Sequence, residues 1–64
     1  MKFKYNAEVD ALVIRFSDDK IDESGEDKPG VILDYDKDGN VVRIEILKAS
    51  QRIGNPGNIE FEVA

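Results

Sequence analysis

Four acidic residues occur at the spacing that a calcium-binding loop requires. Asp34, Asp36 and Asp38 alternate along the chain, Gly39 follows directly, and Glu45 comes after five further residues. Alternating carboxylates wrapped around a glycine turn can converge on a hard cation, and the glutamate can close the cage with both of its oxygens. The pattern therefore raises the hypothesis of a calcium-binding module built on these four carboxylates.

The residues on either side of this loop are typical of strands, whereas helices flank a calcium-binding loop of this kind. A proline and a glycine introduce the segment, and β-branched residues at alternating positions follow it. A two-residue turn at Asp38–Gly39 predicts a β-hairpin over Val31–Leu47, with Asp34 facing Arg43 on one side of the sheet. The same register pairs apolar residues on the other side: Tyr35 with Val42, Leu33 with Ile44, and Val31 with Ile46. Three carboxylates would then lie at a solvated edge, so we expect no metal site and keep calcium binding as the alternative.

Catalysis by a side-chain nucleophile or a general base has little support in the sequence. The chain contains no histidine and no cysteine, which removes the usual bases and nucleophiles. Ser17, Ser24 and Ser50 each lack an activating partner in the neighbouring sequence. We therefore expect a protein that is not an enzyme, with no catalytic residues and no cofactor.

Composition predicts one small acidic domain over residues 1–64. Nine Lys and Arg residues stand against fourteen Asp and Glu residues, which gives a net charge of -5. The basic residues are scattered, so we expect no direct binding to nucleic acid, and the acidic surface favours a basic protein partner. No apolar run is long enough for a membrane span or a signal peptide, so we expect no membrane association and a cytoplasmic location.

Short alternating segments make up most of the remaining chain. Lys2–Tyr5 and Ala11–Ser17 have the period of strands, and Asn58–Ala64 is a final strand or an arm. Asp18–Lys28 carries six acidic residues and is either an exposed loop or a weak edge strand, while Lys48–Ile53 could form a turn of helix. The pattern predicts a mainly β fold, a small antiparallel β-meander of four to six strands with little helix.

One face of this predicted sheet is strongly apolar. It would carry eleven side chains: Phe3, Tyr5, Leu12, Ile14, Phe16, Val31, Leu33, Tyr35, Val42, Ile44 and Ile46. A single sheet has nothing to bury such a face against. We expect the C-terminal tail (residues 51–64) or a second protomer to close it, and favour self-association into a homo-oligomer such as a homodimer. Four apolar residues on the opposite face could form a second contact patch: Val13, Ile32, Val41 and Leu47.

Three segments together resemble a known family. They are YNAEVDALVIRFS from Tyr5, PGVILDYD from Pro29, and GNVVRIEILKAS from Gly39. In their order and spacing they are similar to the small prokaryotic family catalogued as domain of unknown function 2283, over about residues 2–50. Asn6 stands where that family usually has Asp, Arg43 stands where Gly is common, and the tail lies outside the pattern. The resemblance implies a compact β-rich domain without an agreed activity or defined catalytic residues, and an antitoxin-like role in binding a protein partner. We therefore expect a non-enzymatic protein-interaction domain.

Overall fold

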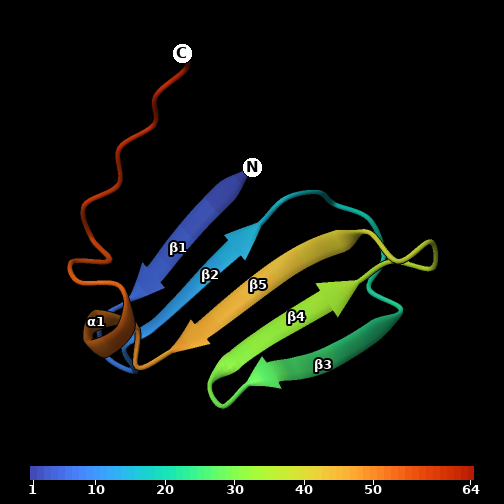
Figure 1. Cartoon of the computed structure of the whole chain (residues 1–64), viewed down its shortest axis with the longest axis horizontal. Coiled ribbons are helices and arrows are strands. Elements are labelled where there is room, and N and C mark those ends of the chain that lie inside the picture. Colours follow the sequence, from blue (N-terminus) through green and yellow to red (C-terminus); the bar gives the residue numbers. More distant parts are fainter.

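The computed structural model describes all residues from 1 to 64 and contains one open antiparallel sheet with one short helix (Figure 1). The elements are β1 (Lys2–Asn6), β2 (Ala11–Arg15), β3 (Glu23–Lys28), β4 (Val31–Tyr35), β5 (Val41–Leu47) and α1 (Ala49–Arg52). This confirms the mainly β fold class and places a turn of helix after β5. The helix has neither the length nor the apolar character needed to cross a membrane.

The strands do not follow one another across the sheet in chain order. Their order is β1-β2-β5-β4-β3, so β5 lies in the centre and pairs with both β2 and β4 (Figure 1). The connection between β2 and β3 therefore runs to the far edge, where the acidic segment ends in the exposed strand β3. Its polarity accounts for this position, because an edge strand can leave charged side chains in water whereas a central strand cannot.

The hairpin between β4 and β5 is confirmed, but its predicted turn is wrong. The N–H of Asp36 donates to Asn40 O at 2.9 Å and the N–H of Gly39 donates to Asp36 O at 3.1 Å, which makes a three-residue loop with Gly39 at φ 83°. Tyr35 consequently pairs with Val41, and a bulge accommodates the additional residue. The predicted partners of Val31, Leu33 and Asp34 are all confirmed.

Hydrogen bonds of the Asp36 side chain explain why the loop has three residues and not two. The carboxylate of Asp36 accepts the N–H groups of Asp38 and Asn40, both at 2.9 Å, and the side-chain amide of Asn40 at 3.3 Å. Short polar side chains of this kind stabilise turns by satisfying backbone donors that the strands leave free. The dipeptide Asp38–Gly39 alone did not reveal that contribution.

Strand register assembles two rows of apolar side chains across one face. One row is Phe3, Ile14, Ile44 and Leu33, and the next is Tyr5, Leu12, Ile46 and Val31. Leu12 is buried, Phe3 is exposed, and the other six side chains are half-buried. These two rows, which we call the apolar face, are covered by no second sheet and no long helix.

The C-terminal tail forms an arm and no strand. Beyond Asn58 its backbone makes no hydrogen bond, and the side chains of Ile59, Phe61 and Val63 are all exposed. Figure 1 shows it leaving α1 and running past the outer side of β1, in the direction opposite to that strand. Closure of the apolar face by a tail or a second protomer stays a prediction.

Candidate interaction surface

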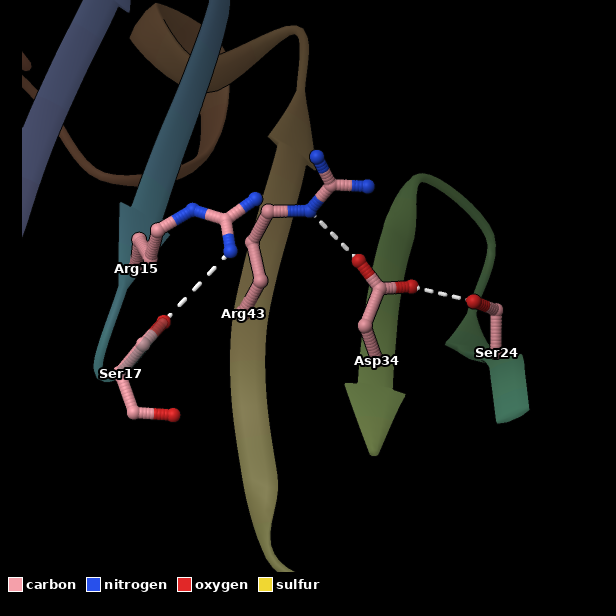
Figure 2. Close-up of polar contacts among 5 residues, drawn as sticks. All are labelled: Arg15, Ser17, Ser24, Asp34 and Arg43. Atoms are coloured by element: carbon pink, nitrogen blue, oxygen red, sulfur yellow. Dashed lines mark hydrogen bonds and ion pairs between the residues drawn. The ribbon is translucent and has the colours of Figure 1, made fainter. Parts of the chain in front are cut away.

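The face opposite the apolar face contains an ion pair between the neighbouring strands β4 and β5, in which the carboxylate is buried and the arginine is half-buried (Figure 2). Asp34 on β4 is 1% exposed, although its two cross-strand neighbours, Ser24 and Arg43, are polar. Arg43 on β5 donates its Nε–H to Asp34 Oδ2 at 2.6 Å, and Ser24 on β3 donates its hydroxyl to Oδ1 at 2.5 Å. Sequence reasoning found the pair with Arg43 but missed the burial and Ser24, because the partner of β3 was unknown.

Opposing effects act on the pKa of the Asp34 carboxyl. Burial raises this pKa, but the hydrogen bonds from Ser24 and Arg43 and the charges of Arg43 and Arg15 together bring it below its usual value. Arg15 lies in the same transverse row and donates weakly to Ser17 O at 3.5 Å. Asp34 is therefore ionised at neutral pH and links three strands.

A second set of hydrogen bonds, centred on the carboxylate of Asp10, joins α1 to the end of the sheet where β1 turns into β2. Asp10 accepts the hydroxyl of Tyr5 and the hydroxyl of Ser50, each at 2.7 Å, and also the N–H of Ser50 at 3.0 Å. These hydrogen bonds, those from Tyr5 first, lower the pKa of Asp10, and the same contact raises the pKa of Tyr5. Asp10 thus anchors the first turn of α1, and its low pKa makes it a weak base toward Ser50.

The predicted calcium ligands are divided between different environments. Asp34 is buried against Arg43, whereas Asp36 caps the hairpin loop, and no three acidic side chains gather where they could hold a metal ion. The hydrogen bond that the backbone N–H of Asn40 donates to Asp36 lowers the pKa of Asp36 most, the bonds from the Asp38 N–H and the Asn40 side chain lower it further, and desolvation partly opposes them. In this arrangement Asp34, Asp36, Asp38 and Glu45 do not fit a calcium cage.

The hairpin tip instead contributes to an acidic hollow. It has a volume of about 420 Å³ and lies between the β2–β3 connection and the β4–β5 loop. No hydrophobic residue lines it; the lining residues are Asp19, Lys20, Asp22, Asp36, Lys37 and Asp38. Its carboxylates can pair with basic side chains, whereas nothing in its lining can hold an apolar ligand.

The apolar face is covered by no second sheet and no long helix, and most of its side chains stay half-buried. Most soluble monomers avoid broad apolar patches, and those that occur usually mark an interaction site. The face spans four neighbouring strands, from Phe3 on the edge to Leu33 on β4. These features define a small single-layer antiparallel β domain with an open apolar face. The acidic residues of the β2–β3 connection, of β3 and of the hairpin tip form what we call its acidic rim.

Comparison with known proteins assigns this domain to a family. The model of the family described as protein of unknown function (DUF2283) matches residues 2–50, and the chain belongs to this family. The expected resemblance is thereby confirmed. No curated protein and no solved structure matches the chain.

Proposed function

We propose that this chain is a non-enzymatic protein-interaction domain that self-associates through the apolar face of its sheet. The observation that carries this proposal is the pair of apolar rows, in which six of eight side chains stay half-buried and one is exposed. Complete burial of an exposed side chain of this kind contributes about 1.5–3 kcal/mol, so covering one that is already half-buried contributes about half as much. A chain of 64 residues gains much of its stability from such a contact, because its own core is small.

The acidic rim supports the second part of the proposal, an antitoxin-like role toward a basic protein. Acidic residues concentrate on one side of the molecule, in the β2–β3 connection, on β3 and at the hairpin tip. A surface with one sign of charge speeds encounter with a partner of the opposite sign. The apolar face would hold two copies together, while the rim stays available to the basic partner. The small, highly charged composition suits such a role in the cytoplasm.

Sedimentation of the wild-type protein tests the self-association. The monomer has a mass of 7.2 kDa. We expect the measured mass to be that of a dimer or a larger closed assembly, and to fall only on extensive dilution. A chain that stays monomeric at high concentration and still unfolds cooperatively would contradict the proposal.

A further inference from the structure

One edge of the sheet is unpaired and carries alternating charge. β1 pairs only with β2, so its outer backbone groups are free. Phe3 and Tyr5 lie on the apolar face, and Lys2 and Lys4 therefore lie on the opposite face. A segment that joins this edge must present apolar residues on one side and acidic residues on the other.

The C-terminal tail has this pattern and no partner. In residues 58–64, Ile59, Phe61 and Val63 alternate with Glu60 and Glu62. The three apolar side chains are 49%, 83% and 79% exposed, although alternation of this kind is typical of a half-buried strand.

One antiparallel register between β1 and residues 58–62 places each lysine opposite a glutamate and each apolar residue opposite another apolar residue. It places Lys2 opposite Glu62, Phe3 opposite Phe61, Lys4 opposite Glu60, Tyr5 opposite Ile59, and Asn6 opposite Asn58. A shift by one residue would turn the glutamates onto the apolar face, and a shift by two would leave only one Lys–Glu pair. The opposite edge of the sheet offers no such match, because β3 carries Glu23, Glu26 and Asp27.

We propose that residues 58–64 of one copy add to the free edge of β1 in a second copy, and that the exchange is reciprocal. The inference rests on the self-association proposed above and names the segment that accompanies it. The competing partner is the tail's own β1: in Figure 1 the tail leaves α1 and runs past the outer side of β1 in the opposite direction, yet beyond Asn58 its backbone makes no hydrogen bond. The single chain therefore leaves both the β1 edge and the tail unpaired, and a reciprocal exchange between two copies pairs both of them in a closed two-fold dimer.

Charge reversal tests the exchange with two variants of the full chain. Glu60→Lys/Glu62→Lys makes tail and edge both basic, and Lys2→Glu/Lys4→Glu makes both acidic. Only alternate amides within residues 59–63 would face β1, and each variant alone is expected to lose the protection of these amides from hydrogen exchange, by about tenfold or more relative to wild type. In a mixture of the two, each tail meets an edge of opposite charge, so protection returns. Glu23→Lys/Glu26→Lys on β3 makes the same change in charge as the tail variant and is expected to keep wild-type protection.

The outcomes separate this inference from the proposed function. Tails that are unprotected in a wild-type protein that sediments as a dimer would overturn the exchange and leave the apolar contact standing. Tail protection that persists in dilute monomers would overturn it in favour of pairing within one chain, and protection that persists in either variant alone would overturn the Lys–Glu register on which it rests. Failure of the mixture to restore protection would also overturn it. A wild-type protein that is monomeric at every concentration would overturn both proposals.

Discussion

Leu33→Lys is expected to convert the self-associated protein into monomers while the sheet remains folded. Leu33 lies in the same transverse row as Ile44 and is half-buried, so the lysine side chain can reach water in the monomer. In a face-to-face assembly its ammonium group would be buried against apolar side chains without a partner. We expect the association constant to fall at least about 100-fold, which corresponds to about 3 kcal/mol, as measured by sedimentation equilibrium.

The neighbouring residue provides a matched control. Ile32 is also half-buried on β4 but lies on the opposite face, where the register places it between Glu26 and Glu45. Ile32→Lys is therefore expected to keep both fold and association. Phe3→Lys, at a site that is already 42% exposed, repeats the test with little risk to folding. Equal loss of association in Leu33→Lys and Ile32→Lys would show that the two faces do not differ.

Arg43→Met is expected to lower the free energy of unfolding by about 2–3 kcal/mol. The substitution keeps the apolar stem but leaves the Asp34 carboxylate, which is 1% exposed, without its closest cation. A domain of this length has a total stability of about 3–10 kcal/mol, so the variant would be close to unfolding. Chemical denaturation followed by circular dichroism measures the change.

The effect of Arg43→Met should depend on pH in a definite direction. In the wild type the pKa of Asp34 is lowered, so its contribution to stability is present above the unfolded pKa of about 3.9 and is lost as pH falls through the folded value. Without Arg43 the burial of Asp34 is less well offset and its pKa rises. The cost of the substitution is therefore expected to be largest near neutral pH and to shrink in acid. Arg15→Met is the comparison variant, because Arg15 acts on Asp34 only through its charge and makes no hydrogen bond with it, so its removal is expected to cost less; equal losses in both variants would contradict the assignment.

The sequence predicted those features that follow from the alternation of apolar and polar residues and from the pairing of opposite charges. The apolar period predicted the hairpin from β4 to β5 and the pairing of β1 with β2. It also predicted all eight members of the apolar face, within a set of eleven. Opposite charges gave the pair of Asp34 with Arg43. These features could be predicted because each follows from whether a side chain is apolar or charged, which determines the face of the sheet on which it lies.

Features that depend on distant partners or on backbone detail were not predictable. The three-residue loop follows from the hydrogen bonds of the Asp36 carboxylate and not from the Asp38–Gly39 pair. The burial of Asp34 requires β3 beside β4, and the alternation of β4 contains no sign of it. Asp10 and Ser50 are 40 residues apart, and only their presence in two segments of the family pattern could have indicated that they meet.

Solvent contact at the two faces of β4 and β5 tests the central claim most directly. A soluble paramagnetic probe broadens the methyl signals of side chains that it can reach. In the wild-type protein we expect the methyl groups of Leu33 and Ile44 to be protected, and those of Ile32, from the opposite face of β4, to be broadened. Broadening of Leu33 and Ile44 to the same degree as Ile32 would mean that the apolar face has no cover, and would contradict the account.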